Sequence, residues 1–207
     1  MPPVPRPVVL PPALRPHPQY AKVAAVISAA AARATPLRGT YFRFMTPKFA
    51  KTADAVSGAG GFHASGRWNP ARCFNLLNAS EMGEVALAEV LSTASYYGLP
   101  IKDSFPKVVT TLDVDLQFSL DLTDRALLRA LGTASAALTG CDFRRENASG
   151  AEAITQAIGR AAFAAGLEAL LVPSAQATGA RNLVVFPQNL QQGSAVTPQG
   201  LDVFDPI

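Results

Sequence analysis

The chain is poor in the residues on which most metalloenzymes and hydrolases depend. Only two histidines, His17 and His63, and two cysteines, Cys73 and Cys141, occur among 207 residues. A zinc site or a histidine-based catalytic triad therefore has almost no side chains to draw on, and we expect no metal. Because the two cysteines are far apart in the sequence, we expect free thiols and no disulfide framework.

Charge and long apolar runs are also scarce. Charged residues make up 16% of the chain, and the net charge is +3. The sequence pI is about 9.1, but the basic residues are scattered, which argues against direct nucleic-acid binding. The sequence contains no run of about 18 apolar residues, which is the length that a membrane-spanning helix needs. Six prolines within residues 1–12 would break the apolar core of a secretion signal. We therefore expect a cytoplasmic protein that does not contact membranes.

The composition predicts one folded domain preceded by a tail. Residues 1–19 hold eight of the 17 prolines, which predicts a mobile, polyproline-like tail. Residues 20–207 are 188 in number, enough for one hydrophobic core, and we expect a single catalytic domain there.

Helical and strand patterns alternate along this domain. Helices are predicted over residues 20–34, from about Ser80 to 97, over 125–131 behind an Asp124 N-cap, and over 151–165 behind a Ser149–Glu152 capping box. Strands are predicted over residues 40–44, 73–77, 107–116, 169–172 and 183–186, and residues 45–65 are predicted to be a loop. The mixed order predicts an α+β fold with a central, largely antiparallel sheet flanked by helices.

One carboxylate stands out against its surroundings. Glu89 lies in the run Val85–Leu91, where its six neighbours are apolar, and helical spacing places it on the stripe of Met82, Val85 and Ala86. A buried lone carboxylate costs several kcal/mol unless cations or hydrogen-bond donors meet it. This cost is characteristic of functional sites. The alternative is that Glu89 reaches solvent past the helix edge.

Two arginines are candidate partners for this carboxylate. Arg43 occupies the centre of the apolar strand 40–44, and Arg67 follows the glycine-rich turn in Gly66-Arg67-Trp68-Asn69-Pro70. The alternatives are that Arg43 points to water from an edge strand and that Arg67 forms a structural salt bridge.

Three separated segments together resemble the RES domain, named for its Arg, Glu and Ser. They are the strand around Arg43, the block Gly66–Pro70 followed by Ala86–Val90, and the tail Val172-Pro173-Ser174 with Asn182–Pro187. The resemblance covers about residues 38–203. The RES domain is the toxin half of bacterial RES–Xre toxin–antitoxin pairs.

The resemblance implies an ADP-ribosyltransferase-like fold and NAD as substrate. It implies cleavage of the nicotinamide–ribose bond by hydrolysis, by phosphorolysis or by transfer of ADP-ribose to a protein acceptor, and an Xre-type antitoxin as partner. Carried over by residue, the catalytic set is Glu89, Arg43 and Ser174, with Arg43 and Arg67 as clamps for the dinucleotide.

The rings and amides near these residues complete the predicted NAD site. Tyr41, Trp68 and Asn69 join the two arginines as candidate binding residues. Trp68 could stack on a base or anchor the turn. Without a histidine to activate it, Ser174 is expected to donate a hydrogen bond. The family usually carries a tyrosine where this chain has Leu77. Either Tyr41 or another ring substitutes for it, or this chain handles the substrate differently.

Three classes of function remain open on these residues. The first is a toxin that consumes NAD by hydrolysis or phosphorolysis. The second is a mono-ADP-ribosyltransferase that modifies one cellular protein. The third is a nucleic-acid-directed toxin or a non-enzymatic binding module.

Overall fold

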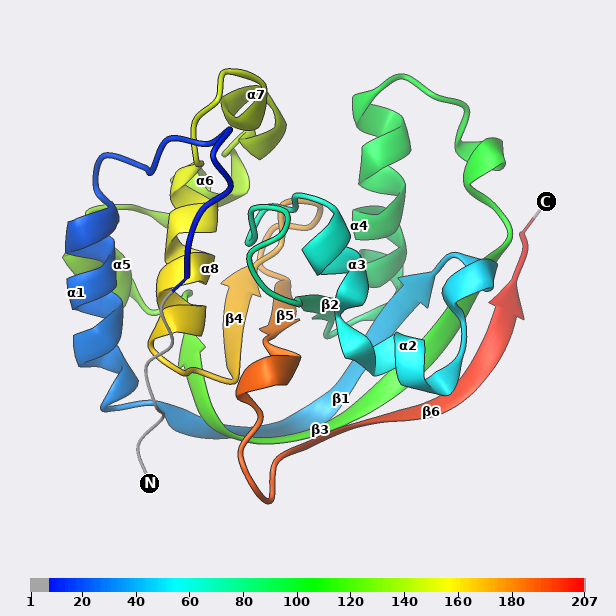
Figure 1. Ribbon diagram of the computed structural model, residues 1–207. Helices are drawn as coiled ribbons and strands as arrows, with labels where there is room; N and C mark the ends of the chain where they lie inside the picture. Colours follow the sequence, from blue (N-terminus) through cyan, green and yellow to red (C-terminus); the bar gives the residue numbers. More distant parts are fainter. Residues whose placement is uncertain (1–7, 207) are drawn as a thin grey trace.

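The computed structural model describes residues 8–206. Its helices are α1 (Tyr20–Ala31), α2 (Thr52–Ser57), α3 (Ala59–His63), α4 (Gly83–Tyr96), α5 (Arg125–Leu131), α6 (Ser135–Thr139), α7 (Phe143–Ala148) and α8 (Ile154–Ala164), with 3-10 turns η1 (Pro47–Phe49), η2 (Ile101–Ser104) and η3 (Pro187–Asn189). Its strands are β1 (Thr35–Met45), β2 (Leu77–Ser80), β3 (Lys107–Asp121), β4 (Ala169–Pro173), β5 (Arg181–Val185) and β6 (Ala195–Phe204). Helices and strands alternate as predicted (Figure 1). None of the helices described is long and apolar enough to span a membrane.

The sheet closes on itself, which the sequence pattern did not predict. Its order is β1-β2-β5-β4-β3-β6, and a further pairing of β1 with β3 joins the first strand to the fifth. The β3–β4 pair is parallel, and the other pairs in the part described are antiparallel. The predicted central, largely antiparallel sheet is therefore found, but it contains one parallel pair and is closed and barrel-like. Whether the sheet closes depends on which distant strands pair and in which register. A local sequence pattern does not determine this pairing.

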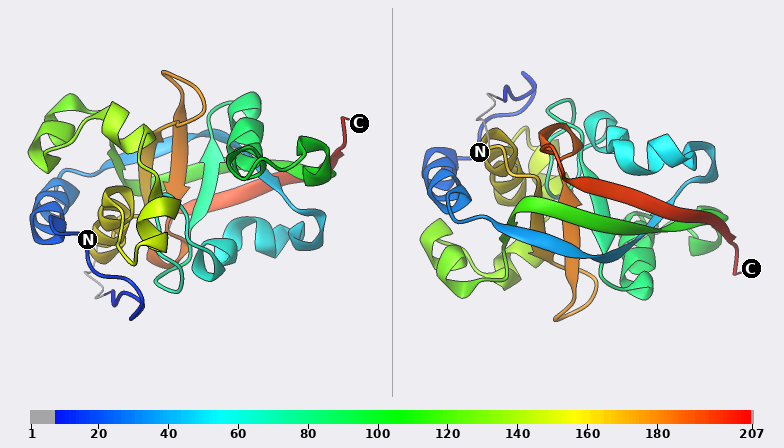
Figure 2. Two further views of the ribbon diagram at one scale, coloured as in Figure 1. Left: turned by 90° about the horizontal axis from the view of Figure 1, so that it is seen from above. Right: turned by 90° about the horizontal axis from the view of Figure 1, so that it is seen from below.

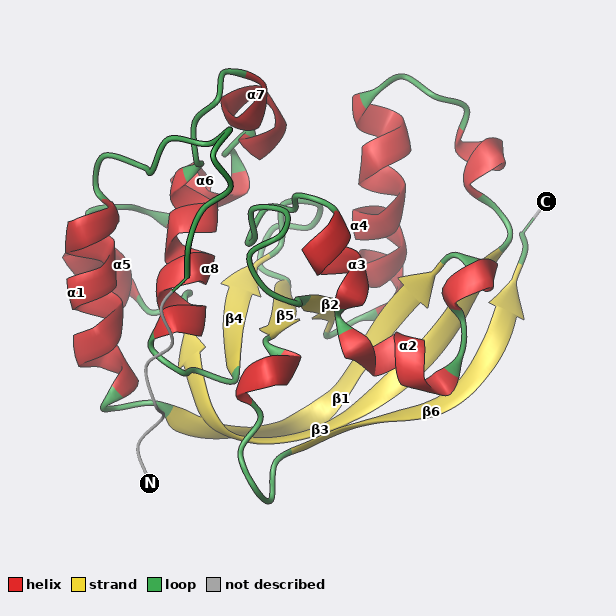
Figure 3. Cartoon of the chain, in the orientation of Figure 1, coloured by secondary structure: helices red, strands yellow, loops and turns green. Residues whose placement is uncertain are grey.

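The two larger hydrophobic cores lie on opposite faces of β4 and β5, and a third, small cluster contains Met45, Ala55 and Val108. Alternate residues of the first five strands point into the closed sheet and form the inner core: Tyr41, Leu77, Ala79, Leu112, Val114, Leu116, Ala169, Leu171, Leu183 and Val185. The opposite faces of β4 and β5 pack against α1, α5 and α8 in the outer core. Figure 3 shows these helices grouped beside β4, with α4 standing apart over β1 and β2. Seen from below, β1, β3 and β6 cross the molecule with no helix in front of them (Figure 2).

Several element boundaries differ from the sequence prediction for identifiable reasons. Residues 45–65 form short helices, because Gly58 adopts a left-handed φ of 64° that links α2 directly to α3. β2 starts at Leu77, where the expected strand 73–77 ends, and α4 begins at Gly83. β6 is absent from the predicted elements, because Pro198 and Gly200 interrupt its pattern. Such residues are tolerated at a sheet edge.

The start of α8 also differs from its prediction. Glu152 does not form the expected capping box, because its fully buried carboxylate forms a two-point ion pair with Arg160, at 2.7 Å for each oxygen. The helix begins at Ile154, and the Gln156 side chain accepts the N–H of Ala153. The predicted Asp124 N-cap is confirmed, since its Oδ1 accepts the N–H of Ala126 at 2.7 Å.

The described part of the proline-rich segment lies against this buried pair. The His17 N–H donates to Glu152 Oε2 at 3.0 Å, and the Tyr20 ring lies over the Arg160 guanidinium. Arg15 pairs with Ala151 as an isolated bridge. The predicted mobile tail covers residues 1–19, and residues 1–7 of it lie outside the described residues.

The turn that carries Arg67 and Trp68 is seated on α8. Gln156 Nε2 donates to the carbonyls of Gly66 and Asn69 at 3.0 and 3.3 Å. The Trp68 carbonyl lies so close to Gly159 that a Cβ there would overlap it. Glycine at position 159 therefore allows the turn to pack against the helix backbone.

Replacing Gly159 with Ala should displace this turn. We expect a loss of about 1–3 kcal/mol in the free energy of unfolding, because a rigid backbone carbonyl must move. Trp68 is the only tryptophan, so its fluorescence emission should shift to longer wavelength as the turn loosens. Gly60→Ala is the control, because a Cβ there meets nothing within 4 Å. Unchanged emission and stability in Gly159→Ala would contradict this packing.

Candidate active site

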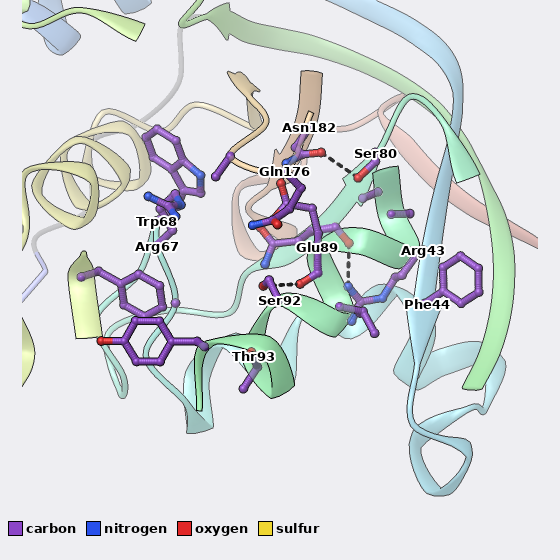
Figure 4. A pocket seen from close by; sticks show the side chains of 18 of the residues that line it. Arg43, Phe44, Arg67, Trp68, Ser80, Glu89, Ser92, Thr93, Gln176 and Asn182 are labelled. Carbon is purple, nitrogen blue, oxygen red and sulfur yellow. Dashed lines mark hydrogen bonds between the residues drawn. The ribbon is translucent and has the colours of Figure 1, made fainter. Parts of the chain in front are cut away.

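A single cavity of about 600 Å³ collects most of the predicted site residues. Its walls come from β1, the turn at 65–68, β2, α4, the start of α7 and the segment between β4 and β5. In Figure 4, Arg67 and Trp68 lie on one side of Glu89, and Arg43 and Phe44 lie on the other. Arg43, Arg67 and Glu89, which span 47 residues of sequence, thus face one cavity.

Neutral donors, not arginines, hold the Glu89 carboxylate. Ser174 Oγ donates to Glu89 Oε1 at 2.7 Å, and Asn182 Nδ2 donates to the same oxygen at 2.6 Å. The helix brings Glu89 to the cavity partly buried, so it does not extend past the helix edge. Within residues 8–206, neither Arg43 nor Arg67 forms an ion pair. The expectation that they contact Glu89 is corrected in this respect.

Ser174 is a hydrogen-bond donor, as expected. It follows β4 directly and is 5% exposed. Its hydroxyl oxygen accepts the N–H groups of Gln176 and Ala177 at 3.0 and 3.3 Å, so the hydroxyl proton is directed at Glu89. No histidine lines the described cavity, so no imidazole is available there to activate Ser174 as a nucleophile.

Arg43 is a cation without a counter-charge. Its Nη1 donates to the Asn78 carbonyl at 2.7 Å, while its buried Nε has no partner among the described atoms. Burial lowers the pKa of Arg43 to about 10. A guanidinium held in this way has unused donors beside the cavity, which an anionic ligand could satisfy.

Arg67 is held more firmly. Its Nη1 donates to the carbonyls of Leu138 and Cys141 at 3.0 and 2.7 Å, and no salt bridge fixes it among the residues described. Burial lowers its pKa, and the neighbouring Cys141 and Glu89 oppose this effect. The remaining guanidinium nitrogens keep their donor capacity.

Two predicted binding residues do not reach the cavity. Tyr41 lies in the inner core with Leu77, and burial, followed by the charge of Glu81, raises its pKa. The closed sheet turns both side chains inward, so Tyr41 does not substitute there for the tyrosine absent at Leu77. Asn69 is 1% exposed and donates to the carbonyls of Gly61 and Ala64, which fixes the turn.

Other side chains, unassigned from the sequence, complete the cavity. Besides the predicted Trp68, the rings that line it are Phe42, Phe44, Tyr96 and Phe143. Arg144 also lines it, with its guanidinium over the Tyr96 and Phe143 rings at 4.7 and 4.6 Å. Asn182 and Ser80 lie opposite each other on β5 and β2. The sequence offered a signal only for Asn182, which is part of the Asn182–Pro187 segment.

No group of three or more His, Cys, Asp or Glu side chains that could hold a metal ion occurs among the residues described. The donor set of the cavity is instead guanidinium, amide and hydroxyl groups around one carboxylate. These groups suit an anionic, hydroxyl-rich ligand.

The protein thus combines a closed mixed sheet with a cavity in which one carboxylate lies between two arginines. Residues 40–204 match the RES domain family model, and the chain belongs to the RES domain family. This confirms the resemblance found in the sequence.

Named relatives and one solved structure extend this assignment. Proteins named NAD(+) phosphorylase MbcT from Mycobacterium tuberculosis (strain ATCC 25618 / H37Rv) and Mycobacterium bovis (strain ATCC BAA-935 / AF2122/97) are each 29% identical over 154 residues, covering 72% of this chain and 76% of theirs. The crystal structure of the M. tuberculosis MbcT–MbcA toxin–antitoxin complex matches with a TM-score of 0.72 and 23% identity, over 89% of this chain and 93% of that one. This structural match supports the fold.

Substitution of Arg43 and substitution of Arg67 should change the free energy of unfolding by different amounts. Arg43→Met should leave the free energy of unfolding within about 1 kcal/mol of wild type or raise it, because a buried unpaired charge is removed. Arg67→Met should lower it by about 1–3 kcal/mol, since two carbonyls lose their donor. Urea unfolding measures both. A larger loss for Arg43→Met than for Arg67→Met would contradict the described contacts.

Proposed function

We propose that the protein is the toxin of a toxin–antitoxin pair and that it consumes NAD by cleaving the nicotinamide–ribose bond. The observation that carries this proposal is the position of Glu89 between Arg43 and Arg67 in one cavity. The name NAD(+) phosphorylase of the MbcT relatives supports the same substrate. The cavity volume of about 600 Å³ is within the range of small-molecule and cofactor sites.

The donor set suits the parts of this dinucleotide. The guanidinium groups of Arg43 and Arg67 can bind pyrophosphate oxygens in a planar, two-point manner. The aromatic rings of the cavity provide stacking surfaces for nicotinamide or adenine. On this proposal Arg43, Arg67 and Trp68 bind NAD, and Glu89 acts on the ribose.

Bond cleavage needs a negative charge near the ribose. The C1′–N bond breaks through an oxocarbenium-like state, and nicotinamide leaves as a neutral molecule that requires no general acid. The Glu89 carboxylate would stabilise the developing positive charge and hold the ribose hydroxyls. A phosphate oxygen then bonds to C1′ and gives ADP-ribose-1-phosphate, or a water oxygen bonds to C1′, releases a proton to solvent and gives ADP-ribose. No step requires a histidine.

The partner and the finer fold class follow from the same proposal. We propose that an Xre-type antitoxin binds this toxin, in line with the toxin–antitoxin complex formed by MbcT and MbcA. We also propose that the closed sheet is ADP-ribosyltransferase-like and that the protein acts on NAD in the cytoplasm.

Purified protein incubated with NAD should release nicotinamide, measured by proton NMR. Phosphate in the buffer should shift the second product to ADP-ribose-1-phosphate if phosphorolysis is the reaction. Label transfer from NAD to one protein of a cell lysate, with little NAD loss without lysate, would instead favour a mono-ADP-ribosyltransferase. Absence of both reactions would contradict the proposal.

Glu89→Gln should lower the rate of nicotinamide release by about 10²-fold or more, because the negative charge at the ribose is removed while the shape is kept. Glu84→Gln is a matched control, since Glu84 is an exposed carboxylate in the first turn of the same helix. Its rate should equal that of the wild type. Equal rates for Glu89→Gln and wild type would contradict the assigned role.

A further inference from the structure

The two oxygens of the Glu89 carboxylate are not equivalent. Oε1 accepts both hydrogen bonds, from Ser174 and from Asn182, at 2.7 and 2.6 Å. Within the described residues Oε2 accepts none, and it is not among the buried atoms that lack a partner. One oxygen is therefore anchored to the protein, and the other is open to the cavity.

The orientation of the Asn182 amide is set by Ser80. Ser80 Oγ donates to Asn182 Oδ1 at 2.7 Å, so the amide oxygen is occupied and the NH₂ group must point at Glu89 (Figure 4). Ser80 is 2% exposed and is the direct cross-strand neighbour of Asn182. Asn182 also pairs with Val172 on β4, so strands hold it on both sides.

We propose that Ser80 and Asn182 are positioning residues that, together with Ser174, fix Oε1 so that Oε2 alone engages a ribose hydroxyl of the substrate. This inference rests on the proposed function for the identity of the ligand. The order Ser80–Asn182–Glu89, by which we mean the chain of hydrogen bonds from Ser80 through Asn182 to Glu89, does not depend on that proposal. Positioning residues of this kind act through the geometry of the reacting group and do not touch the substrate.

The charges around Glu89 make this order testable. Arg43 of β1, Arg67 of the turn, Arg144 of α7 and Tyr96 of α4 are the charged or titratable groups that share its cavity in the part described, and Glu89 is the only carboxylate. Glu81 and Asp121 are nearby in the fold but pair with Arg181, at 2.6 and 3.4 Å.

An aspartate at position 182 would place a second carboxylate against Glu89. Two carboxylates at hydrogen-bond distance cannot both ionise easily, so the pair retains a proton to higher pH. Alanine at position 182 removes the donor without adding a charge. The two variants thus separate loss of a contact from a change in protonation.

The experiment compares Asn182→Ala, Asn182→Asp and Ser80→Ala with wild type in the NAD-cleavage assay across pH. We expect Asn182→Ala to lower kcat by about 10²-fold with little change in KM, because the reacting oxygen is misplaced. Asn182→Asp should move the acid limb of the pH–rate profile up by about one unit or more. Ser80→Ala should fall between wild type and Asn182→Ala.

A matched control variant separates a loss of stability from a loss of Glu89 positioning. Ser119→Ala also removes a buried hydroxyl, which is 3% exposed and donates to the Thr35 carbonyl on β1, away from the cavity. We expect it to lower thermal stability about as much as Ser80→Ala while leaving kcat unchanged. Equal kcat losses in the two serine variants would overturn the positioning role of Ser80.

A second measurement does not depend on turnover. Carbon-13 NMR follows the titration of the Glu89 carboxyl, assigned by its loss in Glu89→Gln, in wild type and Asn182→Asp. An upward shift in Asn182→Asp supports the contact between Asn182 and Glu89, even if wild type releases no nicotinamide and the proposed function fails. Superimposable titrations, or wild-type kcat in Asn182→Ala, would overturn the inference.

Discussion

The site depends on the hydrogen bonds that connect helix α4 to the segment after β4 and to strand β5. Glu89 extends from α4, and its carboxylate is tied to Ser174 after β4 and to Asn182 on β5. These three residues span 94 positions of the chain. Direct pairing places β2, β5 and β4 side by side, and the further pairing of β1 with β3 closes the sheet. The site is therefore assembled by strand pairings between segments that are distant in the sequence.

The site holds charges that have no ion-pair partner among residues 8–206. Arg43 lies in the wall of the cavity and donates to the Asn78 carbonyl, and Glu89 receives neutral donors. The buried Glu152 carboxylate, in contrast, is neutralised by Arg160. Cations without counter-ions beside a partly satisfied carboxylate cost stability, and such a cost is typical of binding and catalytic sites. An anionic, hydroxyl-rich ligand would supply the missing partners.

Local signals in the sequence were enough to point to several residues of the cavity. Glu89 among apolar neighbours, Arg43 in an apolar strand and the Gly66–Pro70 block pointed to residues that do share a cavity. The sequence also predicted the Asp124 cap, the four longest helices α1, α4, α5 and α8, and the strands β1, β3, β4 and β5. Long-range facts were not accessible in this way. The register that places Ser80 opposite Asn182, the inward turn of Tyr41 and the Arg160 partner of Glu152 depend on how distant segments pair.

A crystal structure of the Glu89→Gln protein with NAD bound would test the central claim most directly. The account predicts the nicotinamide ribose within hydrogen-bond distance of residue 89 and the pyrophosphate against Arg43 or Arg67, inside the cavity described. Dinucleotide bound elsewhere on the molecule, or no binding by a correctly folded variant, would contradict it.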